Sequence, residues 1–159
     1  MKLKIGITEA HLKNSISILS SILANEMTFY IKLRKFHWNV SGQSFMELHK
    51  LFEGQYTQLE VSIDETAERI SKLGGKTIGT MKEFSELAII KESPNQYPAQ
   101  KEMLKELLED HETLIVQLRK DVETSAEENN DAGTADFLTS LMLAHETMAW
   151  TLRRYLEEL

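Results

Sequence analysis

The chain has 159 residues, which suits one domain with a single hydrophobic core. It has no cysteine, so disulfides, zinc–thiolate sites and iron–sulfur clusters are excluded, and any bound metal would need nitrogen and oxygen ligands. The formal net charge of −7 opposes binding to a phosphate backbone, because such binding depends on Lys and Arg. Two prolines and seven glycines leave long stretches of good helix formers, which predicts an all-α domain over residues 1–159.

The first half of the chain predicts two long amphipathic helices. Apolar residues recur at steps of three and four from residue 8 to 38, and Ser41-Gly42 interrupts this pattern. The same spacing resumes at Phe45 and continues to Gly74-Gly75, which is a typical signal for the C-terminal end of a helix. The second helix is then about 30 residues long by this periodicity.

After that stop the pattern weakens, and a short apolar patch around Phe84 predicts a small helix inside a long connection. Pro98 suits the first turn of a third helix, which the polar run from 125 to 131 ends. Asp131 or Thr134 can cap a fourth helix that continues almost to the last residue. Four long helices with one long connection between the second and third describe an up-down-down-up bundle of ferritin type, although periodicity alone also allows other four-helix bundles.

Four potential metal ligands lie on the second predicted helix, and they are His49, Glu53, Asp64 and Glu68. Each follows an apolar stripe residue by one position, which turns the whole row about 100° away from the core at 100° per residue. Carboxylates and imidazoles suit iron or another divalent first-row metal. The midpoints of the two halves of the row are about 22 Å apart along the helix, whereas ligands lie within about 2–2.5 Å of their ion.

A single chain therefore cannot bring these four residues to one metal. Two copies of the helix, packed antiparallel about a two-fold axis near residues 58 and 59, would bring each half of the row to the other half on its partner, forming two identical sites. The alternative is an ordinary solvated acidic face, which is the usual interpretation of such pairs on helices.

The remaining histidines give weaker signals. A site inside one bundle would need Glu-x-x-His motifs, and none occurs in the sequence. His111 and His145 lie on apolar stripes and could meet in the core, where we expect hydrogen-bonded structural histidines. His37 ends the first predicted helix, where it could complement the helix dipole instead of binding metal. The neighbouring Trp38 could equally be a packing residue at a helix end or interface.

Three motifs in the first half of the chain carry a resemblance to a known family, and they are Phe36-His37-Trp38-Asn39-Val40-x-Gly42, Phe45-x-x-Leu48-His49-x-x-Phe52-Glu53 and Asp64-x-x-Ala67-Glu68-Arg69-Ile70. The last predicted helix adds Gly133-Thr134-Ala135-Asp136, His145-Glu146 and Trp150-x-Leu152-Arg153. Together these motifs resemble the Dps family of mini-ferritins over nearly the whole chain. The resemblance implies a ferritin-like bundle, with a short helix in its long connection, that assembles into a hollow homo-dodecamer.

The resemblance also implies a ferroxidase centre with iron as its metal. The matching ligands are His37, His49 and Glu53 of one subunit with Asp64 and Glu68 of its two-fold mate, and other divalent metals such as Zn or Mn can occupy such a site. Glu53 stands where many members of the family have Asp. The implied reaction is oxidation of Fe(II), preferably by hydrogen peroxide, followed by storage of Fe(III) mineral, which protects against oxidative damage. Trp38 matches the residue thought to quench stray oxidising equivalents.

The second activity that the resemblance implies is DNA binding through a basic tail. Only Lys2 and Lys4 precede the first predicted helix, and twelve chains would carry a formal charge of roughly −84, so we expect DNA binding to be weak or absent. The alternative function is a nucleoid-binding stress protein with little iron chemistry.

Acidic residues gather near the junction of the third and fourth predicted helices, and they are Glu127, Glu128, Asp131 and Asp136. They could line the family's three-fold ion pores or form a solvated turn. No apolar run approaches 18 residues and the N-terminus has no secretory signal pattern, so we expect no membrane span and a cytoplasmic location.

Overall fold

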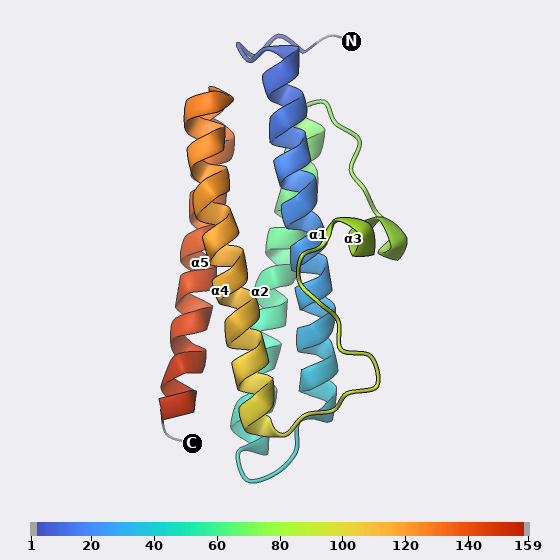
Figure 1. The fold of residues 1–159 in the computed structure, drawn as a ribbon, viewed down its shortest axis with the longest axis vertical. Helices are drawn as coiled ribbons and strands as arrows, with labels where there is room; N and C mark the ends of the chain where they lie inside the picture. Colours follow the sequence, from blue (N-terminus) through green and yellow to red (C-terminus); the bar gives the residue numbers. More distant parts are fainter. Residues whose placement is uncertain (1–2, 158–159) are drawn as a thin grey trace.

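The computed structural model describes residues 3–157, and within them it is all-α (Figure 1). Its long helices are α1 (Glu9–Asn39), α2 (Phe45–Lys72), α4 (Gln100–Glu123) and α5 (Ala132–Glu157). α1 and α2 are antiparallel, α4 runs in the same direction as α2, and α5 returns antiparallel to α4 (Figure 1). This is the up-down-down-up bundle that the periodicity predicts. No helix in the described part of the chain is both long and apolar enough to cross a membrane.

The helix ends follow local chemistry, with one difference from prediction. α2 ends at the predicted glycines: Gly74 has a φ of 83°, which favours glycine, and the N–H of Gly75 donates to the carbonyl of Ile70 at 3.0 Å. Pro98, however, lies outside α4. Ala99 has an extended backbone with a ψ of 167° and forms the cap, so it separates Pro98 from the first helical residue.

The polar run after α4 was expected to end that helix, but the chain continues for one π-helical turn, Thr124–Glu128. The N–H of Asn129 closes this turn on the carbonyl of Thr124 at 3.0 Å. Asp131 then caps α5, because its Oδ1 accepts the backbone N–H of Thr134 at 3.0 Å. Of the two predicted caps, Asp131 is therefore the one that the structure uses.

The connection between α2 and α4 contains the short helix α3 (Met81–Leu87), which packs beside α1 (Figure 1). Thr80 and Glu83 form a capping box at its start. Beyond its end, Asn25 of α1 fixes the chain in place: its Oδ1 accepts the backbone N–H groups of Ile89 at 2.8 Å and Ile90 at 3.0 Å. One buried amide thus replaces the strand or helix partners that this segment lacks.

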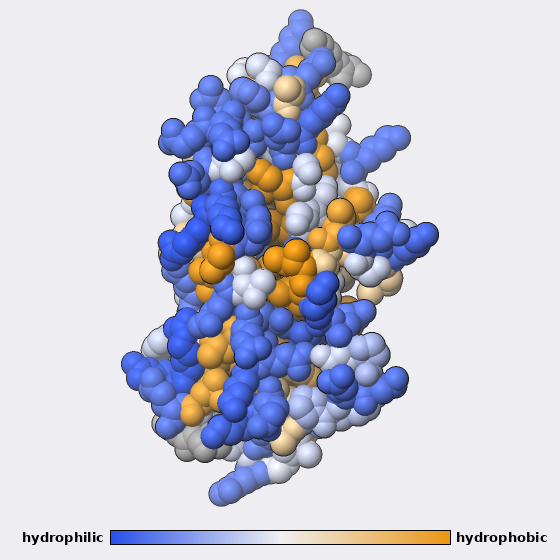
Figure 2. Space-filling view, viewed as in Figure 1, coloured by the Kyte–Doolittle hydropathy of each residue, from blue (hydrophilic) through white to orange (hydrophobic). Residues whose placement is uncertain are grey.

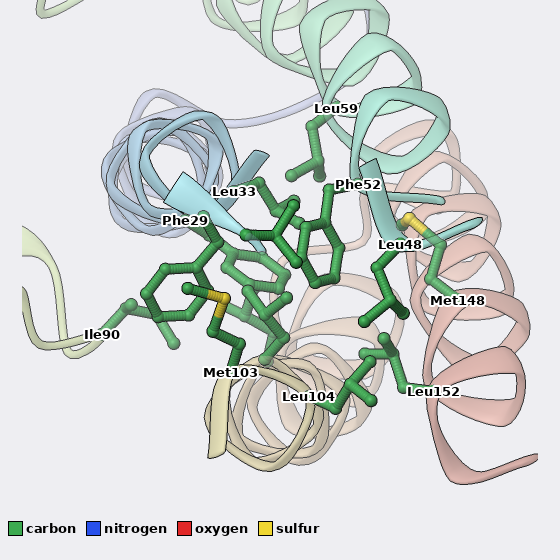
Figure 3. Close-up of a cluster of buried hydrophobic side chains, with 14 residues drawn as sticks. Phe29, Leu33, Leu48, Phe52, Leu59, Ile90, Met103, Leu104, Met148 and Leu152 are labelled. Carbon is green, nitrogen blue, oxygen red and sulfur yellow. The ribbon is translucent and has the colours of Figure 1, made fainter. Parts of the chain in front are cut away.

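Two adjoining clusters of apolar side chains fill the bundle. Figure 3 shows the first, in which side chains from all four long helices point toward one another, among them Phe29, Leu33, Leu48, Phe52, Leu59, Met103, Leu104, Met148 and Leu152. Burying one such side chain contributes about 1.5–3 kcal/mol. The face drawn in Figure 2 is mainly hydrophilic, and its hydrophobic patches lie along the groove between α1 and α4, beside α3, and along the side of α4 that faces α5.

A polar layer crosses the core, with one residue from each long helix: Glu26, Thr66, His111 and His145, each at most 1% exposed. The Nδ1 atoms of His111 and His145 are 2.8 Å apart, and His145 Nε2 is 3.6 Å from Glu26 Oε1. The hydroxyl oxygen of Thr66 lies 3.2 Å from Glu26 Oε2. Burial and the neighbouring His145 lower the pKa of His111 well below its ordinary value of 6.5. The prediction of two hydrogen-bonded core histidines is confirmed, whereas the buried Glu26 was not predicted.

Candidate metal centre

The turn between α1 and α2 brings His37 and His49 together. His37 lies in the last turn of α1 and His49 in the second turn of α2. Their rings stack with centroids 3.7 Å apart and an interplanar angle of 21°. The Nδ1 of His37 is 2.8 Å from the backbone carbonyl oxygen of His49, and the Nδ1 of His49 is 2.9 Å from the carbonyl oxygen of His37.

This reciprocal pair of hydrogen bonds fixes the tautomer of both rings. A carbonyl oxygen only accepts, so each Nδ1 must carry the proton and donate it. In a neutral imidazole the lone pair is then on Nε2, the atom that binds a metal when Nδ1–H is held by a carbonyl. The two histidines are therefore oriented in advance as Nε2 ligands, a feature that their positions in the sequence do not reveal.

Glu53 lies one helical turn after His49, on the exposed surface of α2. The hydroxyl of Tyr56 donates to Glu53 Oε1 at 3.5 Å. The ring of Tyr56 also meets the ring of His37 edge-on, with centroids 5.2 Å apart and an interplanar angle of 80°. The apolar spacing of the predicted helix includes Tyr56 but does not indicate these contacts. Its position three residues after Glu53, on the neighbouring face of the helix, could have predicted the contact with Glu53.

Arg34 is a second neighbour that the sequence pattern missed. Its guanidinium carbon lies 4.4 Å from the ring centroid of Tyr56, 5.5 Å from that of Tyr30 and 5.4 Å from that of Trp38. Its Nη1 also donates to the Tyr30 hydroxyl at 3.2 Å. Trp38 itself is 64% exposed, next to His37, so it contributes little to the core of the chain. These contacts place one cation among three aromatic rings beside the histidine pair.

Asp64 and Glu68 lie further along α2 and do not meet the histidine pair within the chain. Both are exposed, and Glu68 forms an ion pair with Lys72 at 3.0 Å. Asp64 lines a surface groove of about 830 Å³ between α1 and α2. Across the residues described, no group of three or more His, Asp or Glu is placed to hold a metal. The structure therefore brings His37, His49 and the neighbouring Glu53 to one end of α2 and keeps the other two ligands apart from them.

Ile63 and Ala67, the stripe residues just before Asp64 and Glu68, pack against the core as predicted, although they are only partly buried. His49 follows the buried Leu48 by one position, about 100°, but Asp64 follows the buried Ser62 by two, about 200°. Glu68 is related in the same way to the buried Thr66. Hydroxyl side chains can occupy this part of the core because they hydrogen-bond to backbone carbonyls of their own helix. Thr66, for example, donates to the carbonyl of Ser62 at 2.7 Å.

The acidic cluster near the start of α5 divides into two groups. Glu127, Glu128 and Asp136 are exposed, so a pore or turn position stays a prediction for them. Asp131 is 1% exposed and pairs with Arg69 at 3.1 Å, which makes a pore position wrong for this residue.

Asp131 is held as a carboxylate inside this junction. Burial alone would raise the pKa of Asp131, but hydrogen bonds from Thr134 and the charge of Arg69 outweigh burial and lower it. Gly133 leaves room for the arginine, because a Cβ there would lie 2.7 Å from Arg69 Nη2. Of the two lysines predicted to precede the first helix, Lys4 is exposed and Lys2 lies outside the described residues.

Residues 16–159 match the ferritin-like domain family. The chain is 42% identical over 156 residues to an uncharacterized low temperature-induced protein from Nostoc sp., covering 98% of this chain and 87% of that protein. It is 37% identical to DNA protection during starvation protein 2 of Bacillus anthracis, covering 92% of this chain and 99% of the relative. Among solved structures, the Vibrio cholerae Dps protein, described as a member of a superfamily of ferritin-like diiron-carboxylate proteins, superposes with a TM-score of 0.87 at 29% identity and covers 98% and 99% of the two chains. The chain belongs to the Dps family of ferritin-like proteins.

Proposed function

We propose that the protein oxidises Fe(II) at centres shared between two subunits and stores Fe(III) as a mineral inside a hollow oligomer. Each centre would use His37, His49 and Glu53 of one subunit with Asp64 and Glu68 of the partner subunit. The observation that carries this proposal is the reciprocal hydrogen bonding of His37 and His49, which leaves both Nε2 atoms free to bind metal. A pair of histidines serving only the helix dipole would not need this arrangement.

Symmetry supports a second subunit as the source of the missing ligands. Positions 49 and 68 are equally far from the midpoint of the row near residues 58 and 59, and so are positions 53 and 64. An antiparallel two-fold pairing of α2 would therefore align both pairs at once and create two identical centres. The exposure of Asp64 in the groove between α1 and α2 leaves it accessible to such a partner. A closed assembly of twelve subunits is the family's arrangement and stays part of the proposal.

The ligand set suits the proposed reaction. Imidazoles support Fe(II), while carboxylates stabilise the higher charge of Fe(III). Two Fe(II) ions, one hydrogen peroxide and two protons give two Fe(III) ions and two waters, so electrons leave in pairs and no hydroxyl radical forms. The protein would protect against oxidative damage by consuming both iron and peroxide. Zn or Mn could occupy the same ligands without turning over.

The test is an Asp64→Ala/Glu68→Ala variant, assayed for peroxide-dependent Fe(II) oxidation under anaerobic conditions. We expect the rate to fall by at least about 10–100-fold, because loss of groups that only orient metal ligands already has this effect and these two residues are proposed as ligands. Glu102→Ala/Glu123→Ala is the matched control, because both residues are exposed acids on α4, away from the proposed pairing of α2. Equal rates in the wild type and the Asp64/Glu68 variant would contradict the proposal.

The net negative charge of the chain disfavours the alternative function, a DNA-binding stress protein with little iron chemistry. The chain carries a formal net charge of −7, and Lys4 is the one basic residue of the described segment before α1. We expect no retardation of duplex DNA in a gel shift at physiological salt. Retardation that disappears on removal of the first eight residues would favour the alternative.

A further inference from the structure

Tyr56 touches two of the proposed ligands at once. Its hydroxyl donates to Glu53 Oε1 at 3.5 Å, and its ring lies edge-on against His37 with centroids 5.2 Å apart. Tyr56 is half-buried on α2, where it packs against the edge of the first apolar cluster and also contacts His37 and Glu53. Neither the ligand row nor the apolar stripe explains why a hydroxyl should occupy this position.

Arg34 also contacts the ring of Tyr56. Its guanidinium carbon is 4.4 Å from the Tyr56 ring centroid, which is the shortest of its three aromatic contacts. The same side chain is anchored by its hydrogen bond to the Tyr30 hydroxyl at 3.2 Å. A planar cation stacked on one ring and bonded to another restricts the rotation of both. Arg34 therefore limits the positions that Tyr56 can adopt.

Resting on the proposed function, we propose that Tyr56 is a positioning residue of the metal centre. Its ring keeps His37 in the stacked orientation that presents Nε2, and its hydroxyl restricts the rotamers of the otherwise exposed Glu53. Both effects lower the entropy that the ligands lose when a metal binds. Groups that orient metal ligands in this way typically change metal affinity by about 10–100-fold when removed.

Co(II) is a suitable probe, because its visible absorption reports ligand number and geometry without any turnover. The full assembled protein, freed of metal, is titrated with Co(II), comparing the wild type with Tyr56→Phe, which keeps the ring and loses the hydroxyl. We expect Co(II) to bind about tenfold more weakly to the variant, with an altered absorption spectrum at saturation. Tyr56→Leu, which also removes the ring, should weaken binding further. Tyr97→Phe is the matched control, since Tyr97 is exposed in the connection before α4 and its ring contacts Lys35 rather than any proposed ligand.

The outcomes separate this inference from the proposed function. Wild-type affinity and spectrum in Tyr56→Phe, with Co(II) bound normally by the wild type, would overturn the positioning role and leave the metal centre intact. Failure of the wild type to bind Co(II) would overturn the proposed function together with the inference. A merely structural role of Tyr56 would lower the unfolding temperature of Tyr56→Phe and leave the Co(II) spectrum unchanged, which also contradicts the inference.

Discussion

The bundle contains two pairs of histidines that are arranged in opposite ways. His37 and His49 each bond through Nδ1 to the other's backbone carbonyl, so neither Nε2 atom takes part in these bonds. His111 and His145 bond ring to ring through Nδ1, and His145 directs Nε2 toward the buried Glu26. The first pair lies at the ends of two helices, whereas the second is enclosed among α1, α2, α4 and α5. The partner of Nδ1 and the depth at which the ring is buried, and not the residue type, distinguish a candidate ligand from a structural group.

The difference also has an electrostatic side. His111 packs edge-on against Phe29 with ring centroids 4.5 Å apart, and its Nε2 is buried without a hydrogen-bond partner. Charging that ring would place a cation in an apolar environment, which is why burial lowers its pKa. The enclosed pair should therefore govern stability, and the pair at the helix ends should govern metal chemistry. Four predictions test this division, in order of decreasing effect.

The largest effect on stability is expected when His145 is removed from the buried polar layer. His145→Ala leaves a cavity in the core and removes the ring that bonds to His111 Nδ1 and lies beside Glu26, so we expect the free energy of unfolding to fall by about 3–5 kcal/mol, the range for truncating a buried ring. Chemical denaturation measures this loss. Iron oxidation per folded subunit should stay at the wild-type level. A loss of oxidation without a loss of stability would reverse the roles assigned to the two pairs.

The second effect is the mirror image of the first. His37→Ala/His49→Ala should slow Fe(II) oxidation by about 10–100-fold. Because these rings lie at the ends of their helices rather than in the main apolar clusters, the unfolding temperature should change far less than in His145→Ala. Stopped-flow oxidation and thermal unfolding of the same preparation give both quantities. If the double variant oxidised iron normally, the pair at the helix ends would have no part in the chemistry.

The third effect is a pH dependence of the free energy of unfolding, which arises from the titration of His111. Its folded pKa lies below its ordinary value of 6.5, so the unfolded state binds more protons between the two values and stability falls as the pH drops below 6.5. This group should cost up to about 1.4 kcal/mol per pH unit in that range. The variant His111→Gln, which does not titrate, should show a smaller slope in denaturation experiments from pH 7 to pH 5.

Asp131 provides an internal check on that assignment. Its pKa is lowered, so the stability it contributes is present above its ordinary value of 3.8 and is lost only as the pH falls further. Its titration therefore acts at lower pH than that of His111. An unchanged slope between pH 7 and 5 in His111→Gln would show that other groups cause the loss.

The smallest effect concerns the ion pair of Glu68. Lys72 and Glu68 are both more than half exposed, and pairs of this kind on a helix contribute about 0.3–0.5 kcal/mol. Lys72→Ala should therefore change the unfolding free energy by no more than this amount while leaving Glu68 free for the proposed centre. We expect iron oxidation to be unchanged or faster. A marked loss of oxidation would mean that Lys72 has a role beyond this ion pair.

Sequence periodicity was sufficient for the four long helices, because amphipathic stripes and stop signals determine their extent, and the family resemblance selected the ferritin-like bundle among the possible four-helix bundles. Periodicity was not sufficient for the polar interior. Glu26, Ser62 and Thr66 look like solvent-facing positions in a stripe, and their burial depends on partners from other helices or on carbonyls of their own helix. The error for Pro98 was of another kind, since a proline just before a helix and one inside its first turn give the same local signal.

For the site, residue types and spacing identified the candidate ligands, but not how they are held. The reciprocal bonds of His37 and His49 depend on the exact turn between α1 and α2. The contacts of Arg34 and Tyr56 depend on how those helices pack, and two residues 22 positions apart give no periodic signal together. Asp131 was wrong as a pore residue because acidic composition does not distinguish an exposed side chain from a buried helix cap.

The central claim is that a metal site is completed by two copies of α2. The most direct test is anomalous X-ray diffraction from crystals of the assembled protein soaked with Fe(II) or Zn(II). We predict a strong peak bounded by His37, His49 and Glu53, with Asp64 and Glu68 of the partner subunit on its other side. A peak beside the buried His111 and His145, or no metal across the two-fold interface, would contradict the account.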